Sequence, residues 1–390
     1  MTNKNRRIAW AIKARLEEKQ PLIQVVVGPR QVGKTTALKT ALGSTGFYAS
    51  ADYPNPLSFE VIEEWWQEAL QKPEKILAID EVQKITGWSE IIKKLWDTSE
   101  KKMKVVLTGS SALLVEKGLK ETLAGRFELI RAEHWNYQEA KETFDLPLKQ
   151  FVEFGCYPGS IPFLEEKERW GLFVRDSIVE PALGRDLLQL HPVAQPALLR
   201  QIFGVAAALP AQIVSLQKLQ GQLQGKGTLP TIQHYLRLLA DAYLVTGIEK
   251  YYAKSFKSRK SSPKLLIHDN GLIRAFRRPI TQDLSPEEYG RYLENAVGVR
   301  FIEAGWDAYY WKEREAEVDF VLLGPQGEKW AVEVKSAKAS ETELKSLVLF
   351  CERHPEFKPY LVSPYTSPLK QVENLPPEEI LSLHRIYKLF

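Results

Sequence analysis

The 390-residue sequence contains few cysteines and no long apolar run. Its two cysteines, Cys156 and Cys351, are far apart in the sequence, so neither a disulfide framework nor a cysteine-based zinc site is indicated. No apolar stretch approaches the roughly 20 residues that span a bilayer, and the basic start lacks the apolar core and cleavage site of a signal peptide. We therefore expect a cytoplasmic protein that has no membrane partner.

The sequence also has little net charge, +4 from 53 basic and 49 acidic residues. The positive charge is concentrated in residues 250–278, which hold nine basic side chains and one acidic one. That local charge of +8 leaves −4 for the rest of the chain. A basic patch on an otherwise acidic protein is typical of polyanion binding, although charge runs also occur in solvated loops.

Length and patterning predict several domains, because one core usually serves about 150 residues. Through residues 1–132, short apolar runs alternate with helical patterns, which predicts a parallel sheet with crossover helices. Residues 133–192 read as helices interrupted by prolines. Residues 193–284 contain three helical patterns followed by a two-stranded segment, which is a winged-helix pattern. Residues 285–390 read as a separate α/β module.

A phosphate-binding motif follows the first apolar run. Residues 28–35 match G-x-x-x-x-G-K-[ST] between a predicted strand and a predicted helix. The glycines let backbone N–H groups surround phosphate oxygens, while Lys34 neutralises the β- and γ-phosphates and the Thr35 hydroxyl holds Mg²⁺. The predicted nucleotide-binding residues are Gly28, Pro29, Arg30, Gln31, Val32, Gly33, Lys34, Thr35 and Thr36. We therefore predict ATP and Mg²⁺ as cofactors.

Acidic and hydroxyl side chains follow two further apolar runs. Asp80 and Glu81 come directly after the run at 76–79, where open α/β sheets place their ligands. Asp80 would join the Mg²⁺ shell, and Glu81 would polarise a water for attack on the γ-phosphate, which predicts hydrolysis. Ser110 follows the run at 105–107 and would contact the γ-phosphate or that water, with a helix N-cap as the alternative.

These motifs resemble those of AAA+ ATPases of the AAA_14 type that carry a DUF4143-type C-terminal region. The resemblance rests on residues 28–36, 79–83, 107–111 and 123–126, and it continues almost to the C-terminus. It implies that Ser110 is a sensor residue and that Arg126 is presented to nucleotide, often that of a neighbouring subunit. It therefore implies a homo-oligomer, with a hexamer among the options, whereas a structural salt bridge is the alternative role for Arg126.

Four charged residues of the last module follow the order of a nuclease motif. Glu294 lies on a predicted helix and Asp319 on a strand, and the period of the next strand puts Glu333 and Lys335 on one face. Such carboxylates are ligands for one or two Mg²⁺ ions, which would position a water for attack on a phosphodiester. The set resembles the PD-(D/E)xK nuclease superfamily, in which Asp319, Glu333 and Lys335 would be the core triad. Cleavage is left open, because the same fold also serves as a nucleic-acid grip.

The predicted helix at 231–241 turns polar side chains away from its apolar stripe. Together with the basic segment, it supplies the predicted DNA contacts. These are Gln233, His234, Arg237, Lys254, Lys257, Arg259 and Lys260.

The predicted fold class is α/β: a P-loop AAA+ parallel-sheet ATPase domain with a helical lid, a winged-helix domain and a PD-(D/E)xK nuclease-like domain. The predicted function is ATP-driven remodelling or translocation of duplex or branched DNA, with Mg²⁺-dependent nuclease activity left open. One alternative is a nucleotide-dependent binding switch whose nuclease-like domain is catalytically silent. Another is an ATPase whose basic patch is buried against a protein partner.

Overall fold

The computed structural model describes residues 6–19, 22–55, 57–99, 102–109, 119, 121–190, 193–223, 227–252 and 261–385. The chain divides into two compact units, and the division falls between Glu133 and His134. Within the described ranges, no helix combines the length and the apolar character that crossing a bilayer requires.

The first unit is built on a five-stranded sheet in which all neighbouring strands run parallel. In spatial order its strands are β2 (Phe47–Ser50), β3 (Ile76–Asp80), β4 (Lys104–Gly109), β1 (Ile23–Val27) and β5 (Phe127–Arg131). Every residue of β1 and β3 is buried, as expected for parallel strands covered on both faces. The predicted parallel sheet is confirmed.

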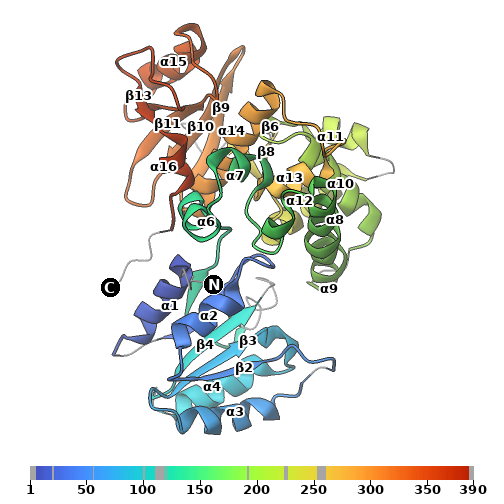
Figure 1. The fold of residues 1–390 in the computed structure, drawn as a ribbon, viewed down its shortest axis with the longest axis vertical. Helices are drawn as coiled ribbons and strands as arrows, with labels where there is room; N and C mark the ends of the chain where they lie inside the picture. Colours follow the sequence, from blue (N-terminus) through green and yellow to red (C-terminus); the bar gives the residue numbers. More distant parts are fainter. Residues whose placement is uncertain are drawn as a thin grey trace. The chain divides into compact units, whose positions relative to one another are not determined.

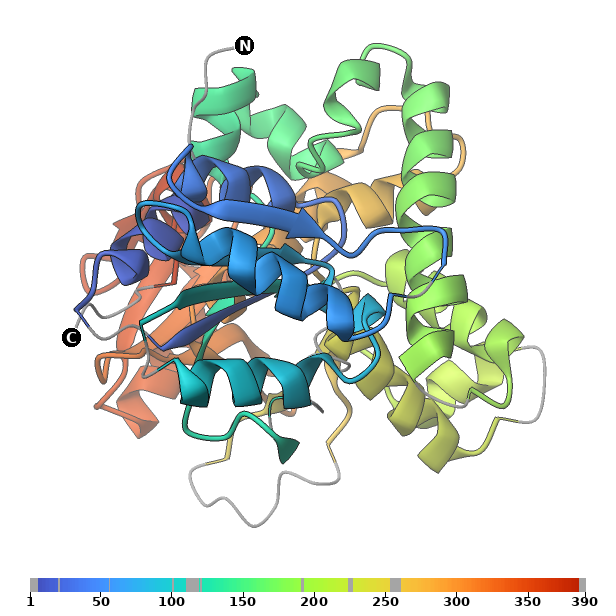
Figure 2. The same ribbon diagram turned by 90° about the horizontal axis from the view of Figure 1, so that it is seen from below.

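Helices cover both faces of this sheet (Figure 1). One face carries α1 (Arg7–Leu16) and α2 (Lys34–Leu42), which contact each other. The other face carries α3 (Glu60–Leu70) and α4 (Trp88–Thr98), which lie side by side in Figure 2. Helix α2 begins directly after β1, so the connecting loop lies at the carboxyl edge of the sheet.

The second unit begins with a mostly helical segment. Its α-helices are α6 (Tyr137–Phe144), α7 (Leu148–Phe154), α8 (Lys167–Phe173) and α9 (Leu187–Leu190). Helix α6 starts at a capping box, in which Asn136 accepts a bond from the Glu139 N–H and the Glu139 carboxylate accepts one from the Asn136 N–H. Wider helical turns at Val174–Val179 and Ala182–Asp186 continue α8 toward α9.

The next segment alternates helices with short strands. Its elements are α10 (Pro196–Ala208), β6 (Gln212–Ile213), α11 (Leu216–Gln222), α12 (Leu229–Asp241), β7 (Val245–Lys250) and β8 (Lys264–Ile267). Strand β8 pairs antiparallel with both β6 and β7. Thr228 caps α12 by accepting a hydrogen bond from the Thr231 N–H, as its place before a proline-led helix indicates.

The remaining elements extend this small sheet into one of eight strands, in the order β13-β12-β11-β10-β9-β7-β8-β6. They are α13 (Asn270–Phe276), α14 (Pro286–Glu303), β9 (Asp307–Glu313), β10 (Ala316–Leu323), β11 (Lys329–Val334), α15 (Lys345–Arg353), β12 (Lys358–Val362), β13 (Glu373–Leu375) and α16 (Pro377–Leu381). The junction is a parallel pairing of β7 with β9, Glu249 opposite Tyr309. Residues 193–284 and 285–390, which the sequence patterns treat as two domains, therefore share one sheet.

Candidate functional site

The loop between β1 and α2 needs glycine at two positions. A Cβ atom at Gly28 would lie 2.1 Å from the backbone oxygen of Ala132, so no larger residue fits there. Gly33 has a φ of +90°, in the left-handed region that disfavours side chains. These constraints let the loop curl closely around whatever lies in front of the α2 N-terminus, where backbone N–H groups favour an anion.

Lys34 is the buried cation of this loop. Its Nζ donates to the carbonyl oxygens of Gly28 at 2.9 Å and Pro29 at 2.6 Å. Burial lowers the pKa of Lys34 to about 8, although Glu81 and Asp80 favour its charged form. A buried ammonium bonded to neutral carbonyl oxygens is the kind of group that a polyphosphate stabilises strongly.

We expect ATP affinity to fall as the pH rises through about 8, because Lys34 must be protonated to pair with the phosphates. Below that pH the ammonium is already formed and binding takes up no proton at Lys34, whereas above it binding must be accompanied by uptake of a proton. Calorimetric titrations with ATP in two buffers of different ionisation enthalpy measure this proton uptake directly. Equal heats in the two buffers at pH 8.5 would contradict the assignment.

The Asp80 carboxylate accepts hydrogen bonds from three hydroxyl groups near the phosphate-binding loop. The Thr35 hydroxyl donates to its Oδ2 at 2.7 Å, the Tyr48 hydroxyl donates to the same oxygen at 3.0 Å, and Thr108 donates to Oδ1. The Thr35 hydroxyl of α2 and the Asp80 carboxylate of β3 are thus adjacent. Both are hard oxygen ligands of the kind that Mg²⁺ prefers. Tyr48 was missed by the sequence reasoning, since a tyrosine on a predicted strand carries no signal of its own.

Glu81 lies one residue beyond this point in a strained conformation. Its φ of 56° and ψ of 41° are left-handed, which is uncommon for a residue with a side chain and occurs often at functional sites. Its Oε2 accepts a hydrogen bond of 2.6 Å from Gln83 Nε2. The left-handed turn separates the direction of the Glu81 side chain from that of Asp80, and the bond from Gln83 holds one oxygen of the Glu81 carboxylate.

Arg126 lies at the opposite edge of the sheet from the phosphate-binding loop. Its carbonyl oxygen accepts from the Ile23 N–H at 2.9 Å, at the start of β1, whereas the loop follows the end of β1. Its guanidinium forms a two-point pair with Asp97, at 2.8 and 2.9 Å. Arg126 is thus remote from the loop of its own unit. Ser110 lies outside the described residues.

Residues predicted to contact DNA are described in part. Gln233, His234 and Arg237 are exposed on α12, as the helical pattern indicates. The other predicted contacts lie outside the described residues: Lys254, Lys257, Arg259 and Lys260.

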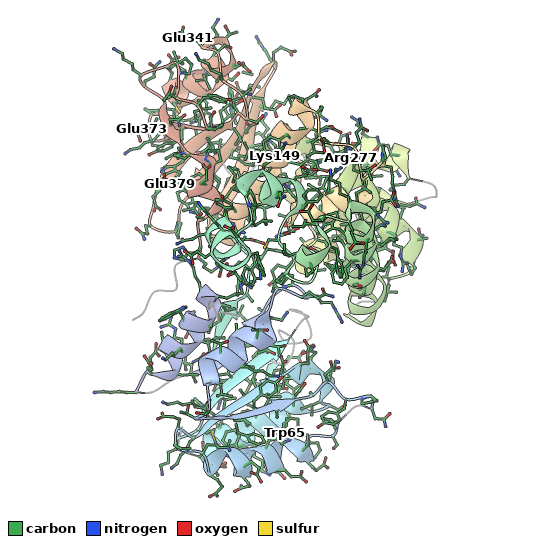
Figure 3. The ribbon with its side chains drawn as sticks, in the orientation of Figure 1. Trp65, Lys149, Arg277, Glu341, Glu373 and Glu379 are labelled. Atoms are coloured by element: carbon green, nitrogen blue, oxygen red, sulfur yellow. The ribbon has the colours of Figure 1, made fainter. Side chains whose placement is uncertain are left out.

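The basic segment is less open than its charge suggests. Lys264 and Arg274 are buried, with side chains that are 1% and 0% exposed, and both are paired with carboxylates. Arg277, labelled in Figure 3, forms a two-point pair with Glu288 at 2.8 and 2.9 Å. A count of charges along the sequence cannot separate such internal cations from surface ones, so it overstates the patch.

The nuclease-like residues are brought together. Glu294 on α14, Asp319 on β10 and Glu333 on β11 form an acidic cluster with Lys335, whose Nζ lies 2.9 Å from Glu333 Oε1. A second lysine, Lys264 at the start of β8, was missed as a member. Its Nζ pairs with Glu294 Oε1 and lies 3.3 Å from Asp319 Oδ1.

Burial governs the protonation of this acidic cluster. It raises the pKa of Glu294 and of Glu333 to about 8, with the charge of Asp319 acting in the same direction. Burial also raises that of Asp319, but Lys264 and Lys335 outweigh it and hold the pKa of Asp319 below its ordinary value. A divalent ion does not fit between Glu294 and Asp319 as they stand, because the Lys264 ammonium is bonded to both.

A second buried polar group lies in the same unit. Glu303 Oε1 lies 2.7 Å from His134 Nδ1 and 3.3 Å from His268 Nδ1. The other ring nitrogens are also bonded, His134 Nε2 to the Tyr157 hydroxyl at 3.1 Å and His268 Nε2 to the Thr246 hydroxyl at 2.7 Å. Every ring nitrogen of the two histidines thus has a hydrogen-bond partner, whereas the buried Glu303 Oε2 has no hydrogen bond among the described residues and lies 3.2 Å from the Arg300 guanidinium.

The chain matches three protein families in succession. Residues 20–141 match an AAA domain. Residues 146–283 match a domain of unknown function, DUF8612, and residues 289–380 match another, DUF4143.

Relatives from bacteria and an archaeon span most of the chain, and each is described as an uncharacterized protein. The relative from Mycobacterium tuberculosis is 26% identical over 339 residues, which cover 85% of this chain and 74% of the relative. The relative from Methanocaldococcus jannaschii is 24% identical and covers 84% of this chain and 80% of its own. One from Haemophilus influenzae is 27% identical and covers 77% and 79%.

Solved structures of P-loop ATPases are similar at low identity. The Walker-type ATPase of Pyrococcus abyssi is 15% identical with a TM-score of 0.43, covering 70% of this chain and 95% of its own. The RuvB Holliday junction branch migration motor of Thermotoga maritima is 15% identical with a TM-score of 0.32, covering 62% and 87%. Because both scores lie below 0.5, neither structure bears on function. The chain thus carries an AAA-type P-loop ATPase domain followed by a DUF4143 region.

Proposed function

We propose that the protein hydrolyses ATP and uses the energy to remodel DNA or to move along it. The observation that carries the hydrolysis is the position of Glu81, directly beyond the point where Thr35 and Asp80 meet. In this proposal Lys34 binds the phosphates, and Thr35 and Asp80 hold Mg²⁺. Glu81 accepts the proton of the attacking water.

The order of elements in residues 196–267 supports DNA as the object of this work. It runs helix, strand, two helices and two strands, with β6, β8 and β7 paired antiparallel, which is the order of a winged helix. The outer face of α12 carries exposed Gln233, His234 and Arg237, whose side chains suit phosphate or base contacts. We therefore take α12 as the DNA-binding helix.

Arg126 supports an oligomeric active form. It lies across the sheet from the phosphate-binding loop of its own unit, so any nucleotide that it serves belongs to a second copy of the chain. Its pair with Asp97 is exposed, and an exposed pair is weak enough to exchange for a phosphate contact. A homo-oligomer, such as a hexamer, would provide that contact.

ATP turnover measured with single-stranded, duplex, forked and four-way DNA tests the proposal. We expect DNA to stimulate turnover and the preferred structure to stimulate it most. If none of these DNA structures stimulated turnover, the proposal that the protein acts on DNA would be contradicted, but the proposal that it hydrolyses ATP would not. That result would instead favour an ATPase that serves a protein partner.

Arg237→Ala is expected to weaken DNA binding and to reduce the slope of log K against log salt by about one, as for the loss of one phosphate contact. Fluorescence anisotropy over a series of salt concentrations measures this slope. Arg353→Ala is the matched control, because it removes an exposed arginine from α15. Equal effects of the two substitutions would count against α12.

A further inference from the structure

Lys264 reaches the acidic cluster from a distant part of the sheet. In the order of strands, β9 and β7 stand between β10, which carries Asp319, and β8, which begins with Lys264. Its Nζ nevertheless pairs with Glu294, lies 3.3 Å from Asp319 Oδ1 and 3.2 Å from the Asp319 carbonyl oxygen, and sits 4.8 Å from the centre of the Phe320 ring. The ammonium is thus enclosed by oxygens and a ring face.

The bonds already made leave few oxygens for a metal ion. Asp319 Oδ1 faces Lys264, and Asp319 Oδ2 accepts the Val334 N–H at 3.0 Å. Glu333 Oε1 is paired with Lys335 at 2.9 Å. A dication on Asp319 Oδ1 would share that oxygen with the buried Lys264 ammonium, and one on Oδ2 would lie on the same carboxylate as the ammonium; in both places the ammonium would repel it.

The charges in this acidic cluster nearly balance without a metal. Glu294, Asp319 and Glu333 offer at most three negative charges, and Lys264 and Lys335 offer two positive ones. Buried carboxylates require cations close by, because desolvation penalises an isolated charge. Here side chains of the protein supply them.

We propose that the Lys264 ammonium takes the place of a divalent cation, which makes the acidic cluster a metal-independent link between β8, α14 and β10. In this role it joins the strands that follow α12 to the DUF4143 region, and it cuts no nucleic acid. The proposal is independent of the ATP site. Of the two alternatives for the C-terminal region, nuclease or catalytically silent domain, it favours the silent one.

Calorimetric titration with Mn²⁺ tests whether the acidic cluster binds a metal ion. It uses the nucleotide-free, metal-stripped full chain, as the wild type and as Asp319→Asn. We expect the two proteins to give the same heats, and neither to nick supercoiled DNA in Mg²⁺ or Mn²⁺. One Mn²⁺ bound by the wild type and lost in Asp319→Asn would overturn the proposal. So would metal-dependent nicking that Asp319→Asn abolishes.

Removing the lysine gives a second, independent readout. Lys264→Ala is expected to lower the thermal midpoint of the unit that begins at His134 by about 10 °C, since it leaves buried carboxylates unpaired. Mn²⁺ should then raise the midpoint of Lys264→Ala while leaving the wild type unchanged. Lys312→Ala, which removes an exposed lysine paired with Glu317, is the control. It should change neither the thermal midpoint nor the response of the midpoint to Mn²⁺. Equal stabilisation of wild type and Lys264→Ala by Mn²⁺ would overturn the proposal, and the wild-type titration decides the matter if Lys264→Ala does not fold.

Discussion

Glu81→Gln is expected to slow ATP hydrolysis by about 100-fold or more, the usual contribution of a general base. The amide has the same shape as the carboxylate and keeps an oxygen that can accept the bond from Gln83 Nε2, which is 2.6 Å long in the wild type. It cannot accept the proton of the attacking water. Phosphate release under saturating ATP measures the loss, and ATP binding should stay close to wild type because Lys34 and Thr35 are untouched.

Two comparisons make this result specific. Lys34→Ala should lose ATP binding itself, because it removes the cation that faces the phosphates. Glu63→Gln, which neutralises an exposed glutamate of α3 paired with Lys94, should behave as the wild type. Wild-type turnover by Glu81→Gln would show that another group accepts the proton.

Arg274→Met is expected to destabilise the unit that begins at His134 by about 3–5 kcal/mol, the range for breaking a buried ion pair. Arg274 is fully buried, pairs with Glu153 at 3.0 Å, and donates to the carbonyl oxygens of Ile280 and Gln282, both at 2.7 Å. Its loss leaves Glu153 buried without its partner. The calorimetric unfolding transition of this unit measures the change.

Controls separate a structural arginine from a DNA-binding one. Arg278→Met removes an exposed arginine of the same segment and should change stability by no more than about 0.5 kcal/mol. The double substitution Arg274→Met with Glu153→Leu should recover part of the loss, because no buried charge is left alone. Weaker DNA binding with unchanged stability in Arg274→Met would place Arg274 in an open basic patch instead.

Local patterns predicted the features that depend on neighbours in the chain. The phosphate-binding loop was predicted because a strand, a glycine-rich turn and a helix follow one another within residues 23–42. The helix predicted at 231–241 rests on its apolar stripe, and in the structure α12 begins two residues earlier, at Leu229. The parallel sheet of the first unit followed from apolar runs that alternate with helical ones.

Contacts between distant residues decided the rest. Glu249 and Tyr309 join two predicted domains into one sheet, and Tyr48 reaches Asp80 from another strand. The sequence alone determined which residues carry charge, phosphate affinity and apolar stripes. Only the tertiary structure decided that Lys264 lies among carboxylates, because burial and pairing depend on which distant segments the fold brings together.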